Sequence, residues 1–278
     1  MLTPHERRID RLYGHGGLGV TADSHRGYMN FGLWDEGIAG YAAAARRMVE
    51  RLGELLGLGP GARVVDAACG RGSQDLDLAD RFGPIEIDAI DVTRRNVDEA
   101  RAQAAGRAGL RFHHGSATRL PFQAGAFTHA ICVEAAHHFD TREAYLREAA
   151  RVLVPGGRIA LADIVLARAP RGRAEHALVA AAAALWQIPR SNLVDLAGYR
   201  ACMERSGFDV RSIENVSAHT FPGYYHAQRQ PERRRELVRS RGRLGASVGA
   251  MMNYAAHRVY RAGLLDYILV AGQTRGGL

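Results

Sequence analysis

Between residues 61 and 165, short apolar runs alternate with longer stretches whose apolar residues recur at helical spacing. The runs predict strands and the longer stretches predict helices. The expected strands are 63–67, 86–91, 110–113, 128–134 and 158–163, and the expected helices are 74–82, 94–106 and 142–153. Strands that alternate with helices in this way are typical of a parallel sheet covered on both faces.

The flanking segments follow a different pattern. Residues 41–58 predict an amphipathic helix, which the glycines and the proline of residues 57–61 bring to an end. After Val165 the alternation breaks, and further helical segments are expected at 174–206 and about 229–262, with strands at 208–216 and 265–272. We therefore expect an α/β fold, a doubly wound and mostly parallel seven-stranded sheet with helical lid insertions.

The composition is that of an ordinary globular protein, with 278 residues of which 47% are apolar. No apolar run reaches the roughly 18 residues that a membrane span requires. The first residues are charged and lack the apolar core of a signal peptide, so we expect a cytoplasmic protein without a membrane partner. The three cysteines, Cys69, Cys132 and Cys202, lack metal-site spacing, so neither a disulfide framework nor a structural zinc site is expected.

The net charge of +8 would suit an anionic partner, and all 37 basic residues are arginines. The densest cluster comprises Arg229, Arg233, Arg234, Arg235, Arg239, Arg241 and Arg243. Glutamates interrupt this cluster and no aromatic residues alternate with the arginines. A solvated helix face is the favoured interpretation and an anion-binding surface the alternative. No nucleic-acid partner is expected.

A glycine turn follows the first expected strand, where residues 64–72 read VVDAACGRG. Gly70 and Gly72 allow the backbone to approach a ligand closely, and the helix behind them presents its N-terminus to a polar group. Asp91 ends the next strand about 20 residues later, where a carboxylate can accept hydrogen bonds from both ribose hydroxyls. The combination indicates a cofactor that contains a nucleoside.

Two features of the turn argue against a nicotinamide dinucleotide. Asp75 occupies the place of the third glycine in the G-x-G-x-x-G pattern. Asp66 directly precedes the turn, where its charge would repel a pyrophosphate but attract a sulfonium or an ammonium group. The late apolar strand at 265–272 also departs from the regular alternation of a dinucleotide-binding domain.

Several segments now complete a resemblance to class I S-adenosylmethionine-dependent methyltransferases, in the group that includes ubiquinone/menaquinone C-methyltransferases and bacterial natural-product (sugar) O-methyltransferases. The turn DAACGRG resembles the first motif of the family, and residues 90–92 (IDV) resemble the second. Residues 115–122 (GSATRLPF) resemble the third, and residues 153–158 (LVPGGR) match the turn before the fifth strand. Upstream, residues 28–34 (YMNFGLW) resemble the aromatic segment that folds over the cofactor.

The resemblance implies S-adenosyl-L-methionine as cofactor and assigns its contacts. Asp66 would orient the methionine amino group together with Gly70 and Gly72. Asp91 would hold the ribose, and Gln74 would point toward the methionine carboxylate or a water. A carboxylate that only ties down the turn is the alternative interpretation of Asp66.

Ser116 and Ala117 would flank the adenine, although the family usually has aspartate where Ser116 stands. A serine hydroxyl can still accept a hydrogen bond from the adenine amino group, but a weaker one than a carboxylate accepts. Core packing is the alternative for the two aromatic residues of the upstream segment. The expected cofactor-binding residues are Tyr28, Trp34, Asp66, Ala68, Gly70, Gly72, Gln74, Asp91, Val92, Ser116, Ala117 and Val133.

Candidate catalytic residues follow the fourth and fifth strands, at the sheet edge where ligands of such folds bind. His137 and His138 lie in the segment EAAHHF, and Asp163 ends the expected strand 158–163. A histidine can take the proton from a hydroxyl that attacks the methyl carbon, and a nearby carboxylate would orient the ring. We expect His138 to be the base, with His137 as the alternative. No metal is implied, because no compact carboxylate cluster accompanies the histidines.

These observations predict three parts of the chain: N-terminal helices and a cofactor-covering segment at 1–60, a cofactor-binding core at 61–165, and the rest of the sheet with lid insertions (about 170–206 and 220–262) at 166–278. The leading hypothesis is a small-molecule O-methyltransferase of natural-product biosynthesis. The alternatives are methylation of nitrogen or carbon, on a heteroaromatic or isoprenoid acceptor, and cofactor binding without methylation. The sequence leaves the acceptor and the oligomeric state open, with a homodimer among the candidates.

Overall fold

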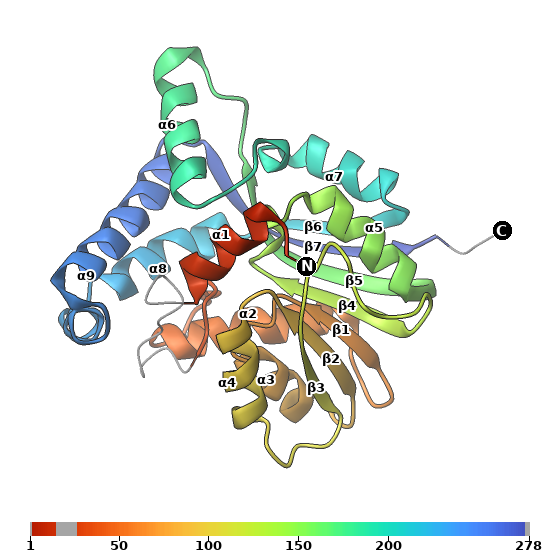
Figure 1. The fold of residues 1–278 in the computed structure, drawn as a ribbon. Helices are drawn as coiled ribbons and strands as arrows, with labels where there is room; N and C mark the ends of the chain where they lie inside the picture. The colour runs from red at the N-terminus through yellow and green to blue at the C-terminus, as the bar shows by residue number, and fades with distance from the viewer. Residues whose placement is uncertain (1, 15–26, 276–278) are drawn as a thin grey trace.

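The computed structural model describes residues 2–14 and 27–275, apart from the side chain of Arg241. Over these residues a seven-stranded sheet forms the centre of the molecule, in the order β3-β2-β1-β4-β5-β7-β6 (Figure 1). The strands are β1 (Arg63–Ala67), β2 (Glu86–Asp91), β3 (Leu110–His114), β4 (Phe127–Val133), β5 (Leu153–Leu166), β6 (Phe208–Asn215) and β7 (Leu265–Thr274). All pairings are parallel except those of β7 with β5 and β6. The predicted doubly wound, mostly parallel sheet is confirmed.

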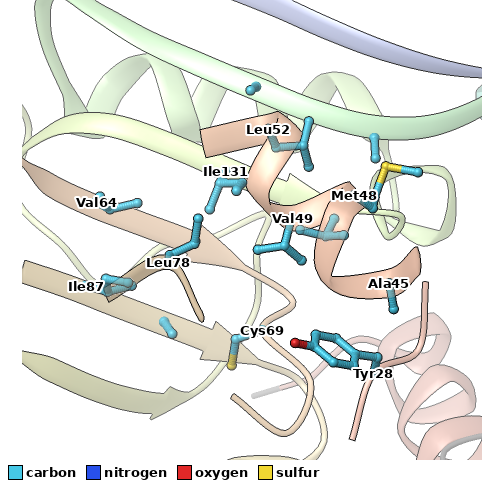
Figure 2. Close-up of a cluster of buried hydrophobic side chains, with 14 of the residues drawn as sticks. Tyr28, Ala45, Met48, Val49, Leu52, Val64, Cys69, Leu78, Ile87 and Ile131 are labelled. Atoms are coloured by element: carbon cyan, nitrogen blue, oxygen red, sulfur yellow. The ribbon is translucent and has the colours of Figure 1, made fainter. Parts of the chain in front are cut away.

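Helices cover both faces of the sheet because the strand side chains alternate between two apolar surfaces. On one face pack α2 (Tyr41–Leu56), α3 (Ser73–Phe82) and α4 (Arg94–Gln103), and on the other α5 (Arg142–Val152) and α7 (Leu196–Arg205). Figure 2 shows Met48 and Leu52 of α2 over Val64 and Ile131. Val65, which follows Val64 in β1, belongs to the core on the opposite face, together with side chains of α5. Each such aliphatic side chain contributes about 1.5–3 kcal/mol when it is fully buried.

The remaining helices gather beyond the carboxyl ends of the parallel strands (Figure 1). They are α1 (Pro4–Tyr13), α6 (Gly172–Leu185), α8 (Phe221–Gln228) and α9 (Pro231–Arg261). None of the described helices is both long and apolar enough to cross a membrane. The N-terminal helix and the two insertions therefore supply a cover over one edge of the sheet.

Both predicted lid helices are interrupted. The segment 174–206 divides into α6, a short 3₁₀ turn at Arg190–Asn192 and α7. Pro189 disfavours helical geometry at the residue before it, and Asp195 caps the new helix by accepting a hydrogen bond from the Gly198 N–H. In the second insertion α8 begins before residue 229, and Gly242 breaks α9 with φ of 69°.

Two strand boundaries differ from the expected ones at the functional edge. β4 ends at Val133, which leaves Glu134 outside the strand with a φ of 55°. β5 continues to Leu166, because Arg158–Leu166 pairs residue by residue with β7. Asp163 therefore lies inside β5 rather than at its end, in a fully buried position.

The chain order locates the crevice of the sheet. β1 leads outward to β2 and β3, and β4 then starts on the opposite side of β1. Ligands of open α/β sheets bind where the strand order reverses in this way, outside the carboxyl ends of the strands. Asp66 of β1 and Glu134 after β4 flank this point.

Candidate active site

A cavity lies at this switch point and is lined by α1, the turn after β1, the ends of β2 and β4, and the lid helices. Most of the expected cofactor residues line it, namely Tyr28, Ala68, Gly70, Gln74, Asp91, Val92, Ala117 and Val133. The other four, Trp34, Asp66, Gly72 and Ser116, lie outside its lining. The expected cofactor-binding segments therefore converge on one cavity, although four of the expected residues do not line it.

Asp91 fixes the glycine turn. Its Oδ2 accepts a hydrogen bond from the Gly70 N–H at 2.9 Å, and its Oδ1 accepts one from the Thr93 N–H at 2.7 Å. Gly70 has a φ of +56°, and a Cβ atom there would lie 2.5 Å from the Met29 side chain. A side chain at position 70 would thus displace Met29, which lines the cavity.

Gly72 is required for a different reason from the one expected. Its φ is +82°, and an added Cβ would come within 2.9 Å of Ala100 on α4 and 3.0 Å of Phe112 on β3. The missing side chain allows α3 to pack against its neighbours. Close approach to a ligand is not what the local geometry requires of Gly72.

Asp66 is fully buried at the end of β1 and accepts a hydrogen bond from Gln74 Nε2 at 2.5 Å. Gln74 is thus bound to Asp66 and also lines the cavity, with a second N–H of its amide beyond this bond. Burial raises the pKa of Asp66 to about 7 and the pKa of Asp91 to about 6. Neither carboxylate forms an ion pair within the described residues. Two buried carboxylates without a cation suit a ligand that has an ammonium group and ribose hydroxyls.

The upstream aromatic residues divide into one that lines the cavity and one that does not. Tyr28 lines it and is also part of the core (Figure 2). Trp34 donates a hydrogen bond from Nε1 to the Phe31 carbonyl at 2.9 Å and packs against Gly223 of α8. Trp34 therefore packs behind the aromatic segment 28–34 without lining the cavity. This is the packing role that the sequence analysis gave as the alternative.

Ser116 hydrogen-bonds to a residue that the sequence analysis missed. Its hydroxyl donates to the carboxylate of Glu6 on α1, and Glu6 lines the cavity. The second oxygen of Glu6 accepts a hydrogen bond from the Thr3 N–H at 2.6 Å, as part of the capping box of α1. A carboxylate thus lies beside Ser116 although the family's usual aspartate is missing from the chain at that position.

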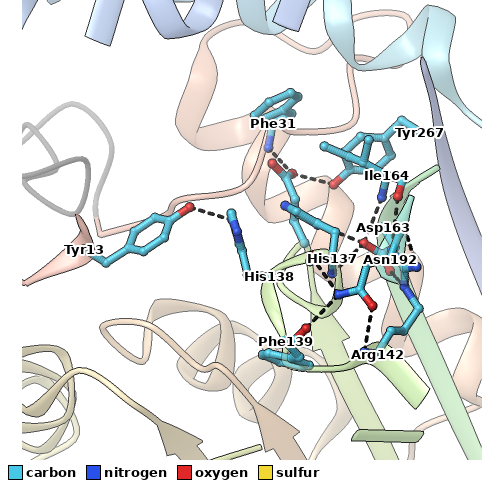
Figure 3. A network of polar contacts seen from close by, with 11 residues as sticks. Tyr13, Phe31, His137, His138, Phe139, Arg142, Asp163, Ile164, Asn192 and Tyr267 are labelled. Atoms are coloured by element: carbon cyan, nitrogen blue, oxygen red, sulfur yellow. Dashed lines mark hydrogen bonds and ion pairs between the residues drawn. The ribbon is translucent and has the colours of Figure 1, made fainter. Parts of the chain in front are cut away.

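His137, and not His138, is the histidine paired with Asp163 (Figure 3). Its Nδ1 lies 2.9 Å from Asp163 Oδ1, and its backbone N–H donates to the same oxygen at 3.2 Å. Because an ionised carboxylate can only accept, Nδ1 must carry a hydrogen, and in the neutral ring the lone pair then lies on Nε2. His137 lines the cavity, and its Nε2 makes no hydrogen bond within the described part of the chain.

Arg142 holds Asp163 in place, and Asn192 braces the backbone around them. Arg142 Nε donates to Asp163 Oδ2 at 2.8 Å, and the Asn192 amide joins the backbone of His137 and Phe139 to that of Arg142 (Figure 3). Burial acts to raise the pKa of Asp163, but the Arg142 charge and the His137 hydrogen bond outweigh it and lower that pKa below its ordinary value. The carboxylate therefore stays ionised and fixes the ring of His137.

His138 connects the site to α1 instead. Its Nε2 lies 2.9 Å from the Tyr13 hydroxyl, and its carbonyl accepts a hydrogen bond from His5 at 2.6 Å. Burial raises the pKa of Tyr13, so the hydroxyl keeps its hydrogen. Burial and the neighbouring His137 hold the pKa of His138 well below its ordinary value. The Nε2 atom of His138 is therefore engaged by the Tyr13 hydroxyl.

Comparison with known proteins now gives this arrangement a family. A sequence profile of the methyltransferase domain matches residues 64–157. The 27-O-demethylrifamycin SV methyltransferase of Amycolatopsis mediterranei is 30% identical over 234 residues, which cover 82% of this chain and 79% of that protein. The methyltransferase GfsG of Streptomyces halstedii is 31% identical over 70% of each chain.

The chain belongs to the class I S-adenosylmethionine-dependent methyltransferases. The structure of geranyl diphosphate C-methyltransferase from Streptomyces coelicolor A3(2) has the same fold, with a TM-score of 0.74 at 21% identity over 98% of each chain. The predicted family, the enzyme class and S-adenosylmethionine as cofactor are thereby confirmed, and the acceptor class is a small molecule. Among the described residues of the methyltransferase, no group of three His, Cys, Asp or Glu side chains is arranged to hold a metal ion.

An unexpected carboxyl group lines the cavity of the methyltransferase three residues before His137. Glu134 lines the cavity, and its Oε2 accepts hydrogen bonds from the Tyr267 hydroxyl at 2.5 Å and the Phe31 N–H at 2.6 Å. Burial raises the pKa of Glu134 to about 8. The left-handed backbone at this residue is a strained conformation of the kind that occurs at functional sites. Its position after a strand at the crevice was the available sequence signal.

The acceptor side of the cavity is mostly aromatic and aliphatic. Phe31 stacks on Tyr224 with ring centroids 4.1 Å apart, and Trp186, Phe221 and Val259 also line this side. Arg233 of α9 lines the same cavity and is only 8% exposed. The expectation of a solvated face therefore fails for this member of the arginine cluster, whereas Arg234, Arg235 and Arg239 are exposed.

Proposed function

We propose that this enzyme is an O-methyltransferase of natural-product biosynthesis in which His137 is the general base. The observation that carries the proposal is the buried pair of His137 and Asp163 in the cavity wall. The pairing leaves the Nε2 lone pair of His137 without a hydrogen-bond partner. The proposal differs from the sequence expectation, which put His138 first.

The chemistry assigned to these residues is one proton transfer coupled to one methyl transfer. S-adenosylmethionine, when bound, supplies an electrophilic methyl group on a sulfonium. As the acceptor oxygen forms its bond to the methyl carbon, the carbon–sulfur bond breaks and the hydroxyl proton moves to His137 Nε2. Asp163 stabilises the imidazolium that results, because its carboxylate stays ionised. Most of the rate enhancement comes from in-line positioning and the exclusion of water.

The cofactor contacts assigned to this chain follow from the same cavity. Asp66 would attract the methionine ammonium by its charge from behind the cavity wall, Asp91 would accept from the ribose hydroxyls, and Glu6 would accept from the adenine amino group. Glu6 would replace the aspartate that related methyltransferases usually carry at the position of Ser116. Tyr28 would cover the cofactor from the N-terminal side.

The name of one relative supports an oxygen acceptor. The relative from Amycolatopsis mediterranei is named as the methyltransferase of 27-O-demethylrifamycin SV. The structural neighbour from Streptomyces coelicolor is named as a C-methyltransferase, but its 21% identity bears on the fold alone. A base in the cavity wall favours methylation of a hydroxyl, which must lose a proton during transfer.

The test uses S-adenosylmethionine labelled in the methyl group, the purified enzyme and a fractionated extract of the organism that carries the gene. We expect label in the small-molecule fraction that an organic solvent extracts, and no incorporation without enzyme. Label in protein or RNA contradicts the proposal. Retention of the cofactor without incorporation in any fraction contradicts it as well and favours a non-methylating role.

A further inference from the structure

Arg233 is an unusual group to find in the wall of an otherwise apolar pocket. It lies in the first turn of α9 and is 8% exposed, whereas neighbouring arginines on the same helix face solvent. The pocket residues around the acceptor are mostly apolar or aromatic, and they include Trp186, Phe221, Leu237 and Val259. A guanidinium in such a wall loses most of its hydration.

The partners of Arg233 within the protein satisfy only part of it. Nε donates to Gln228 Oε1 at 3.1 Å. Nη1 is buried without a hydrogen bond, and the carboxylate paired with it, Glu236 Oε2, lies 3.8 Å away. That separation gives electrostatic attraction but is too long for a hydrogen bond. A buried charged group with an unused hydrogen-bond donor is destabilising unless a further group accepts that hydrogen bond and balances the charge.

We propose that Arg233 binds a carboxylate of the acceptor, so that the substrates of this enzyme are apolar hydroxy acids. The proposal rests on the function proposed above, and it adds a second anchoring point to the same cavity. The hydroxyl of the acceptor would lie at His137, and its carboxylate would lie at Arg233. The planar guanidinium matches the geometry of a carboxylate, and one carboxylate can accept two parallel hydrogen bonds from it.

The number of charges favours a carboxylate over a diphosphate. Arg233 is the one arginine among the described residues that line the cavity, and the chain has no lysine. One guanidinium, already partly compensated by Glu236, can balance a single negative charge. A diphosphate carries several negative charges and would need additional cations. This argues against the isoprenoid diphosphate that the sequence left open.

The first test needs no knowledge of the acceptor. The labelled product from the extract is passed over an anion exchanger at about pH 8, where a carboxylate is ionised and binds. We expect retention, followed by elution at about pH 3, where a carboxylic acid becomes neutral. A labelled product that is not retained overturns the proposal while leaving methyl transfer intact. A product that stays bound at about pH 3 is a phosphate or a sulfate and overturns it too. The absence of any labelled product contradicts the proposed function itself.

The second test compares two arginines of one helix in the same extract assay. We expect Arg233→Gln to lower the rate of label transfer at least tenfold at limiting acceptor and to leave the affinity for S-adenosylhomocysteine within about twofold. Arg234→Gln, at an exposed neighbouring position, is the matched control and should behave as the wild type. Equal rates for the two variants overturn the assignment of Arg233, and the anion-exchange result stands even if Arg233→Gln folds poorly.

Discussion

His137 and His138 are neighbours in the chain, yet their rings contact different parts of the fold. His137 pairs with Asp163 of β5, and His138 pairs with Tyr13 of α1. Both residues lie in one short 3₁₀ turn, where consecutive side chains point in different directions. The sequence located the pair at the correct sheet edge but could not assign the partners, because the orientation of that turn depends on long-range contacts.

This difference predicts the kinetics of two substitutions. His137→Asn keeps a donor for Asp163 but removes the Nε2 base, so we expect kcat to fall by roughly 10²–10⁴. His138→Gln keeps an amide near the Tyr13 hydroxyl and should lower kcat less than tenfold. Steady-state kinetics, with the affinity for S-adenosylhomocysteine measured in parallel, decide between them. A larger loss of kcat in His138→Gln would reverse the assignment.

Glu6 provides a second prediction for a single residue. If its carboxylate accepts a hydrogen bond from the adenine amino group, Glu6→Gln should weaken S-adenosylhomocysteine binding roughly tenfold, because hydrogen bonds to charged groups are the stronger ones. Titration calorimetry measures this affinity. Arg11→Gln, at an exposed position of the same helix, is the control. An unchanged affinity in Glu6→Gln would limit this residue to capping α1.

At the scale of elements, α1 connects two parts of the site, Ser116 and His138, through three of its residues. It contributes Glu6 beside Ser116, Tyr13 beside His138, and His5 on the His138 carbonyl. The sequence indicated N-terminal helices and a covering segment, but nothing in the residues of α1 showed where they would pack. Contacts more than 100 residues apart in the chain cannot be derived from local periodicity. Residues 15–26 of the expected cover lie outside the described residues.

The role of α1 can be tested by breaking the helix at an exposed position. Arg8→Pro removes a helical hydrogen bond and should destabilise α1 by about 3 kcal/mol. We expect the dissociation rate of S-adenosylhomocysteine to rise at least tenfold, while the melting temperature of the free protein changes little. Arg8→Ala removes the same side chain without breaking the helix and should retain the wild-type rate. Equal dissociation rates in both variants would show that α1 does not cover the cofactor.

At the scale of the whole molecule, the free protein carries several buried carboxyl groups with raised pKa values. They include Asp66 at about 7 and Glu134 at about 8. A carboxyl group whose folded pKa is raised favours the folded state at low pH, and this contribution is lost as the pH rises to the folded pKa. The lowered pKa of His138 acts in the opposite direction, but its contribution is complete above about pH 6.5.

The free energy of unfolding should therefore fall by about 2 kcal/mol between about pH 6.5 and 8. Denaturant titration without cofactor measures the change. Glu134→Gln cannot ionise and should reduce the dependence, whereas Glu36→Gln, in an exposed loop, should not alter it. Stability that rises over this pH range would contradict the raised pKa values of these carboxyl groups.

Most of the architecture could be predicted because it depends on short apolar runs and on polar residues at strand ends. Asp66, Asp91 and the histidine pair all follow such runs. Arg233 shows the limit of that reasoning, since a dense arginine cluster with glutamates is typical of a solvated helix. The packing of α9 against the cavity, which buries one arginine of the cluster, is a property of the assembled fold.

The most direct test of the account is the identity of the atom that receives the methyl group. The enzyme is supplied with S-adenosylmethionine carrying a ¹³C methyl group, and the labelled product from the extract is analysed by ¹³C NMR. We predict a methyl group bonded to oxygen in a small molecule, formed at a rate that His137→Asn reduces. A methyl group bonded to carbon or nitrogen would contradict the assignment of an O-methyltransferase with His137 as its base.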